Sequence, residues 1–234
     1  MWRKLAGLAA LTLMASPAQA CRLALVLAID VSSSVDTAED RLQRHGLAQA
    51  LIAPDVVAAF FASDDPVALA AFEWSGRYNQ ALLADWTLIR APADLTRLSA
   101  QIAASPRSHN DFPTALGYAL GHAAGLLRTA PPCLFQTVDI AGDGINNEGF
   151  GPQDAYRAFP FQNVTVNGLV VNAADFEGEV GLIPFYRDEV LHGPGAFLET
   201  ADSFSDYPRA MRRKLIKELG VQVLGSAAEI GAQG

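Results

Sequence analysis

Residues 23–34 have the sequence LALVLAIDVSSS, in which seven apolar residues lead directly into Asp30, Val31 and three serines. A continuous apolar run of this kind is typical of a β-strand buried on both faces, as in a parallel sheet. In an open α/β sheet, ligands bind at the carboxyl ends of the strands. The run therefore predicts a buried strand over 23–29 whose following loop carries Asp30, Ser32 and Ser34 to that edge.

Strands and helices are expected to alternate along the rest of the chain. Apolar runs predict further strands over 67–72, 80–89, 134–141 and 164–171, and a short sixth over 195–198. Apolar residues at helical spacing predict helices over 37–53, 93–104 and 114–128, and a last helix through 211–219 that Gly220 closes. This alternation predicts one open, mostly parallel sheet with helices on both faces.

The composition and the first residues indicate a single exported domain. The chain has 17 Lys+Arg against 25 Asp+Glu, and this net charge of −8 argues against a nucleic-acid-binding protein. Residues 1–20 combine Arg3 and Lys4 with a short apolar stretch and a final Ala-Gln-Ala, as in a secretory signal peptide. An uncleaved membrane anchor is the alternative interpretation. We expect a signal peptide over 1–20, a domain over 21–225 without a transmembrane segment, and a flexible tail over 226–234.

Two further polar positions are predicted to lie near the loop that follows the first strand. Thr114 opens a predicted helix, and Asp143 stands in Gly-Asp-Gly directly after the fourth predicted strand. Together with Asp30, Ser32 and Ser34 they offer hydroxyl and carboxylate oxygens, which are the ligands that Mg²⁺, Mn²⁺ and Ca²⁺ prefer. The alternative is that the Asp and Ser residues only cap a helix.

The combination of Asp30-x-Ser32-x-Ser34, Thr114 and Asp143 resembles the metal-ion-dependent adhesion site (MIDAS) of von Willebrand factor A (vWA) domains. More closely, the chain resembles an uncharacterised bacterial family of exported vWA-like proteins. Four phrases carry that similarity, namely FEWSG at 72–76, GDGINN at 142–147, VNGL at 166–169 and GPGAF at 193–197. The resemblance covers nearly the whole mature chain and implies the doubly wound, Rossmann-like vWA fold. The sequence departs from the pattern where Phe112-Pro113, rather than a glycine, precedes the threonine.

The resemblance implies a role for each residue of the site. Ser32 and Ser34 would ligate a divalent cation directly, and Thr114 would ligate it directly or through water. Asp30 and Asp143 would act mainly through bound waters. One coordination position would stay open for an Asp or Glu of a partner protein. Mg²⁺ is the expected cation, with Mn²⁺ or Ca²⁺ as alternatives.

The resemblance also implies a use for the two cysteines. The first and fourth strands of a vWA domain are parallel neighbours, and Cys21 and Cys133 precede Asp30 and Asp143 by nine and ten residues. Both cysteines would then lie at a similar height on adjacent strands, so we expect a Cys21–Cys133 disulfide, which export permits. A lipid anchor on Cys21 is the alternative.

These features predict a binding module and not an enzyme. We expect a periplasmic or secreted protein. Its expected function is cation-dependent adhesion to an acidic residue of a partner protein. A metal-independent scaffold of the cell envelope is the second hypothesis. A hydrolase with Ser34 as nucleophile is the third, although no G-x-S-x-G elbow surrounds that serine. The last predicted helix is expected to present a solvated basic face or a membrane or partner patch, formed by Arg209, Arg212, Arg213, Lys214 and Lys217.

Overall fold

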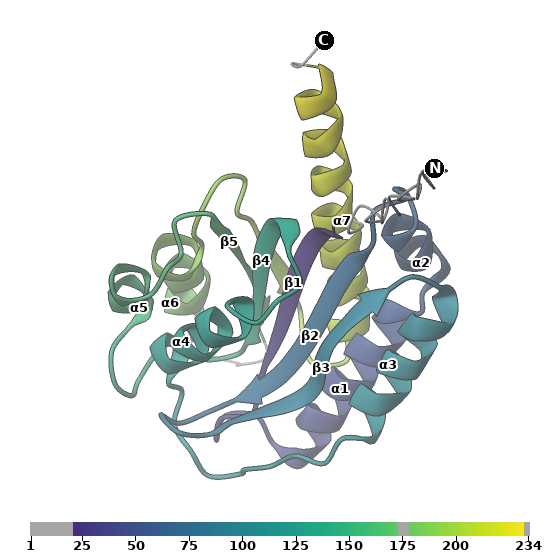
Figure 1. Cartoon of the computed structure of the whole chain (residues 1–234). Helices are drawn as coiled ribbons and strands as arrows, with labels where there is room; N and C mark the ends of the chain where they lie inside the picture. The colour runs from purple at the N-terminus through teal and green to yellow at the C-terminus, as the bar shows by residue number, and fades with distance from the viewer. Residues whose placement is uncertain (1–20, 173–177, 232–234) are drawn as a thin grey trace, which may run out of the picture.

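The structure is a computed structural model, and it describes residues 21–172 and 178–231. Its centre is a six-stranded sheet with the order β3-β2-β1-β4-β5-β6 (Figure 1). The strands are β1 (Cys21–Asp30), β2 (Val67–Trp74), β3 (Gln80–Ile89), β4 (Cys133–Gly142), β5 (Val164–Val171) and β6 (Leu198–Ala201). β3 pairs antiparallel with β2, and the other neighbouring strands are parallel. The predicted mostly parallel sheet is confirmed.

Helices cover both faces of the sheet (Figure 1). One layer contains α1 (Thr37–Leu51), α2 (Pro54–Phe60), α3 (Pro92–Ala104) and α7 (Tyr207–Gly231). The other contains α4 (Leu116–Leu127), α5 (Pro152–Ala158), α6 (Gly178–Phe185) and a π-helical turn, η1 (Tyr186–Val190). Successive side chains of a strand point to opposite faces, so Leu25 and Leu27 of β1 pack in the first layer and Ala24 and Val26 in the second. Every residue of β1 is buried, which explains its continuous apolar sequence.

Three predicted boundaries are wrong. The sixth strand begins at Leu198 and not at 195, because Gly193 and Gly195 adopt φ values of +83° and +70° and form a turn. The helix expected over 37–53 ends at Leu51, and Pro54 starts α2 at a position where proline is favoured. The last helix passes through Gly220 and continues to Gly231. The predicted signal peptide lies outside the described residues, and the flexibility of the tail stays a prediction.

The predicted disulfide is present. Cys21 on β1 and Cys133 on β4 are partners in the parallel register, with Cα atoms 4.2 Å apart and sulfur atoms 2.01 Å apart. The bond occupies the sulfur that a lipid thioether on Cys21 would need.

The start of β1 lies against the middle of α7. The buried Arg22 guanidinium donates to the carbonyl of Leu219 on α7 (3.1 Å) and to the carbonyls of Ala59 (2.9 Å) and Phe60 (3.0 Å) on α2. These bonds fix α2 and α7 to the amino edge of the sheet, which is opposite to the edge that carries Asp30. No helix within 21–172 or 178–231 combines the length and apolar character needed to cross a bilayer.

The expectation of a solvated basic face on α7 is wrong for Lys214. This side chain is fully buried under the sheet, where its Nζ lies 2.5 Å from Asp139 on β4 and 2.8 Å from Glu218 on α7. Asn167 on β5 donates to the same Glu218 oxygen (2.7 Å). The ammonium is therefore the counter-ion of two buried carboxylates. The more exposed Arg212 pairs with Asp55 of α2.

Candidate functional site

Three loops meet at the carboxyl edge of the sheet. They are the loop that follows β1, the segment that precedes α4, and the loop that follows β4. β1 and β4 are adjacent and parallel, with Ile29 opposite Ala141, so both strands end side by side. The parallel pairing thus brings Asp30 and Asp143 to the same edge, as the sequence predicts.

The five predicted site residues form one hydrogen-bonded cluster. The Ser32 amide donates to Asp30 Oδ1 (2.7 Å), and the hydroxyls of Ser32 and Ser34 are 3.1 Å apart. Ser34 Oγ donates to Asp143 Oδ1 (2.7 Å). Thr114 Oγ1 donates to Ser32 Oγ (3.2 Å). Residues from three separate segments therefore place three hydroxyls and two carboxylates within contact of one another.

The cluster is deeply set but open on one side. Asp30 and Ser32 are fully buried and Thr114 is almost so, whereas Ser34 is exposed and Asp143 is partly exposed. Solvent can therefore reach the cluster from the side of Ser34 and Asp143.

Two buried oxygens beside the cluster lack a hydrogen-bond partner in the described part of the chain, Asp30 Oδ2 and Tyr186 Oη. Both lie close to Gly142. A Cβ atom on that glycine would be 2.9 Å from Asp30 Oδ2 and 2.6 Å from Tyr186 Oη, so only glycine allows this approach. Tyr186, on η1, is a neighbour of the site that sequence reasoning missed.

In the protein without a bound cation, burial raises the pKa of both carboxyl groups of the site. Burial is the main cause that raises the pKa of Asp30 to about 8, and the neighbouring Asp143 adds to it. Burial also raises the pKa of Asp143, against the hydrogen bond from Ser34. The positive charge of Arg107 opposes both shifts. An added positive charge at this place would favour the ionised carboxylates.

The loop after β1 is held by hydrogen bonds at both of its ends. At its start, the Val31 amide donates to the carbonyl of Trp74 (2.8 Å), and Gln43 Nε2 donates to the carbonyl of Asp30 (2.6 Å). At its end, Asp36 caps α1 by accepting from the amides of Ala38 and Glu39, and the Glu39 carboxylate accepts from the Asp36 amide. This reciprocal pattern is a capping box.

Thr114 is held by the loop that follows β4. Its amide donates to Asn147 Oδ1 (2.9 Å), and its carbonyl accepts from the amide of Asn147 (3.0 Å). Asn146 Oδ1 accepts from the amide of Leu116 at the start of α4 (2.8 Å). Asn146 and Asn147 thus join two of the three loops. Both asparagines belong to the family phrase GDGINN at 142–147, and their position close behind Asp143 was the signal that the sequence offered.

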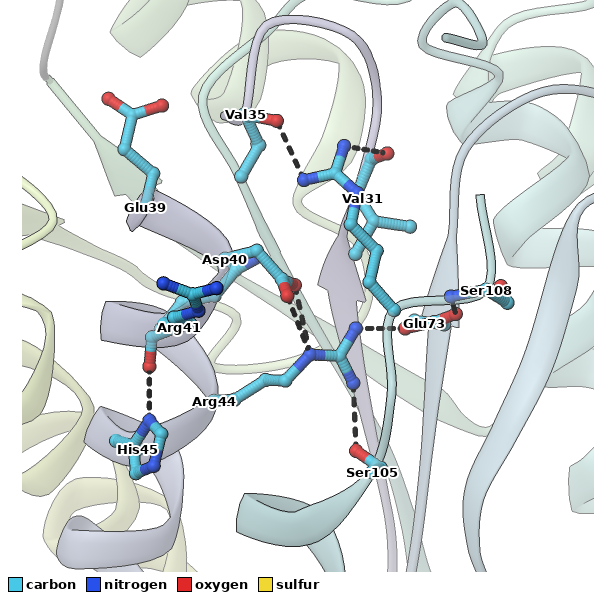
Figure 2. Close-up of polar contacts among 12 residues, drawn as sticks. Val31, Val35, Glu39, Asp40, Arg41, Arg44, His45, Glu73, Ser105 and Ser108 are labelled. Carbon is cyan, nitrogen blue, oxygen red and sulfur yellow. Dashed lines mark hydrogen bonds and ion pairs between the residues drawn. The ribbon is translucent and has the colours of Figure 1, made fainter. Parts of the chain in front are cut away.

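A buried ionic network connects α1, β2 and the segment between α3 and α4 (Figure 2). Arg44 of α1 forms ion pairs with Asp40 on its own helix (2.9 Å) and with Glu73 on β2. It also donates to Ser105 Oγ (2.8 Å), and the Ser108 amide donates to Glu73 Oε1 (2.7 Å). The network fastens the segment between α3 and α4 to α1 and β2.

The donor set at the carboxyl edge consists of hard oxygens, which suit Mg²⁺, Mn²⁺ or Ca²⁺. Across the described ranges there is no group of three or more His, Cys, Asp or Glu side chains that could hold a metal ion. Any cation here would depend on the hydroxyls of Ser32, Ser34 and Thr114 as much as on the two carboxylates. The unpartnered Asp30 Oδ2 is compatible with such a ligand or with a water bound to it.

One protein family matches most of the chain. A family described as "Protein of unknown function (DUF1194)" matches residues 20–223. The sequence matches none of the curated proteins.

Several solved structures share the fold. A von Willebrand factor type A protein from Catenulispora acidiphila aligns with a TM-score of 0.58 and 16% identity over 86% of this chain and 43% of that one. Proximal thread matrix protein 1 from the mussel byssus, in a structure with a zinc-occupied MIDAS motif, aligns with a TM-score of 0.60 and 16% identity, over 86% and 48%. The pilus adhesin SpaC from Lactobacillus rhamnosus GG aligns with a TM-score of 0.59 and 13% identity, over 86% and 31%. The chain thus has a vWA-like fold and spans less than half the length of these proteins.

Proposed function

The chain belongs to the family described as "Protein of unknown function (DUF1194)", and from its vWA-like fold and its site we propose that it is an exported, cation-dependent protein-binding module. The residues that hold the cation would be Asp30, Ser32, Ser34, Thr114 and Asp143. Mg²⁺ is the cation that we expect, with Mn²⁺ or Ca²⁺ as alternatives.

One observation carries this proposal, namely the contact between three hydroxyls and two carboxylates from three loops. Serine and threonine hydroxyls are neutral ligands, so a dication held by them keeps more of its charge than one held by carboxylates. Such a cation would attract a further carboxylate from outside. The open side at Ser34 and Asp143 gives a partner's Asp or Glu a way in.

Two further observations support the proposal. The Cys21–Cys133 disulfide is of a kind that persists in oxidising compartments, which agrees with export to the periplasm or beyond. Neighbours in fold include an adhesin and a protein with an occupied MIDAS motif. A hydrolase based on Ser34 has less support, because the hydrogen-bond partners described for its hydroxyl are Ser32 and Asp143 and not a histidine.

The experiment that tests the proposal is isothermal titration of the chelator-treated chain, without residues 1–20, with Mg²⁺, Mn²⁺ and Ca²⁺. We expect saturable binding that Asp143→Asn abolishes, since that change keeps the side-chain shape and removes one carboxylate. Asp154→Asn on α5 is the matched control, because this exposed aspartate pairs with Arg157 away from the site.

A bound cation then has to be linked to partner binding. We expect immobilised chain to retain a peptide that contains a glutamate only when the cation is present, and to release it on chelation. Loss of cation binding in the Asp154→Asn control, or equal binding by Asp143→Asn, would contradict the proposed site. Partner binding that survives both chelation and Asp143→Asn would favour the metal-independent scaffold.

A further inference from the structure

Arg107 lies between α3 and α4, on a segment that faces the loop after β1. Its guanidinium donates to the carbonyls of Val31 (2.9 Å) and Ser32 (3.2 Å) at the start of that loop. It also donates to the carbonyls of Val35 (2.7 Å) and Asp36 (3.2 Å) at the end. One planar side chain therefore ties together both ends of the loop.

The same guanidinium also contacts its own segment, through Nε and through the terminal nitrogen that donates to Val31 and Ser32. Nε donates to the carbonyl of His109 (2.6 Å), and a terminal nitrogen lies 3.5 Å from the carbonyl of Asn110. These acceptors, like those on the loop, are main-chain carbonyls. The contacts depend on the path of the backbone, and only the five-donor fork of arginine can make this many of them at once.

The segment that carries Arg107 is itself anchored on each side of that residue. Ser105, two residues before, accepts from Arg44 (2.8 Å), and the amide of Ser108, one residue after, donates to Glu73 (2.7 Å). The side chains of Arg44 and Glu73 are 3% and 1% exposed, so the base of the segment is fixed in the interior. Arg107 therefore transmits a rigid support to the loop and does not merely follow its movement.

We propose that Arg107 is a positioning residue of the candidate site. By holding both ends of the loop after β1, it fixes the separation of the Ser32 and Ser34 hydroxyls before any ligand arrives. Its effect on cation binding rests on the proposed function, but its effect on the loop does not. The two effects can therefore be measured separately.

The loop is tested by amide hydrogen exchange on the metal-free full chain, comparing wild type with Arg107→Ala, Arg107→Lys and Arg97→Ala. In the wild type the Ser33 amide donates to the carbonyl of Phe112 (2.8 Å) and the Val35 amide to that of Ser32 (3.0 Å), so both report on the loop. We expect exchange across 31–36 to rise at least about tenfold in Arg107→Ala, because several hydrogen bonds from a charged donor are lost. Arg107→Lys should lie in between, since an ammonium has three donors.

The matched control is Arg97→Ala, which removes an exposed arginine of α3 whose described partner is Asp94 on the same helix. It should leave exchange across 31–36 unchanged. Free guanidinium ion, at a concentration too low to denature, should restore slow exchange to Arg107→Ala and leave Arg97→Ala as it was. A side chain with only a general stabilising role would not show this local rescue.

The effect on cation binding is tested by titrating the same variants with Mn²⁺ and measuring their affinity for it. We expect about a tenfold loss in Arg107→Ala, comparable to the loss of one charged hydrogen bond. Unchanged exchange across 31–36, or an even rise over the whole chain, overturns the positioning role. If the wild type binds no divalent cation, the proposed function fails, and the exchange measurements still decide the role of Arg107.

Discussion

At the scale of single residues, Asp30 decides how the site responds to pH. Burial and the adjacent Asp143 raise the pKa of Asp30 to about 8, so the carboxyl group is mostly protonated near neutrality. A divalent cation competes with that proton. We predict that the affinity for Mn²⁺ rises with pH and levels off above about 8, and that binding near pH 7 releases protons. Titration in two buffers of different ionisation enthalpy measures the released protons directly.

The same titration at a series of pH values gives the control. Asp154→Asn should follow the wild-type profile, because this exposed carboxylate lies outside the site. An affinity that stays constant between about pH 6 and pH 9 would mean that Asp30 is already ionised, contrary to its buried setting.

Tyr186 allows a second test at a single atom. Its hydroxyl is buried without a described hydrogen-bond partner, whereas the hydroxyl of Tyr156 donates to the carbonyl of Val190. We predict that Tyr186→Phe leaves the free energy of unfolding unchanged or raises it by up to about 1 kcal/mol, while Tyr156→Phe lowers it by about 1 kcal/mol. Urea denaturation of both variants measures the difference. A loss in Tyr186→Phe as large as in Tyr156→Phe would show that the Tyr186 hydroxyl has a partner.

At the scale of secondary-structure elements, Lys214 fastens α7 to the sheet. We predict that Lys214→Met lowers the free energy of unfolding by about 3–5 kcal/mol, because it leaves Asp139 and Glu218 as buried carboxylates without their cation. Lys217→Met on the same helix is the matched control. Lys217 is exposed, and its Nζ lies 3.9 Å from the centre of the Phe197 ring. Its replacement should therefore change the free energy of unfolding by no more than about 1 kcal/mol. Equal effects in urea denaturation would contradict the role of Lys214.

The same contact between β4 and α7 predicts how stability depends on pH. Burial and the nearby Glu218 raise the pKa of Asp139 to about 7, well above that of an aspartate in the unfolded chain. A raised pKa means that the folded state binds the proton more tightly, so this contribution is present at low pH and is lost as pH rises from about 4 through 7. Asp139→Asn should flatten that part of the curve. Thermal unfolding of the metal-free chain at a series of pH values checks this, and the same slope in both proteins would contradict it.

The elements that the sequence predicts well are those whose pattern arises from burial. β1 and β2 are covered on both faces, so their apolar runs are continuous and mark the strands to within two residues. The burial of Lys214 could not be predicted, because its counter-ions come from β4 and from the next turn of its own helix. At the site, parallel pairing is enough to bring Asp30 and Asp143 together. Arg107 and Tyr186 could not be predicted, since one contacts main-chain carbonyls and the other arrives from η1.

At the scale of the whole molecule, the disulfide closes a long loop. Cys21 and Cys133 are separated by 112 residues and join two central strands. We predict that Cys21→Ser with Cys133→Ser lowers the free energy of unfolding by about 4–5 kcal/mol, mainly because the unfolded chain becomes less restricted. Urea denaturation of the double variant and of the reduced wild type should give the same value. A change below about 1 kcal/mol in both would contradict this prediction.

The contact between Arg22 and Leu219 has a consequence for the orientation of the domain. It places the first strand's beginning next to α7, whose last turns extend past that edge of the sheet (Figure 1). Asp30 is nine residues further along β1, about 30 Å away at 3.3 Å per residue. A surface or a protein attached at the start of β1 or at the last turns of α7 would lie at one edge of the sheet. The carboxylates and hydroxyls of the site would lie at the opposite edge, facing away from the attachment. With either attachment, the edge that carries the site would stay accessible to a second molecule without a long spacer.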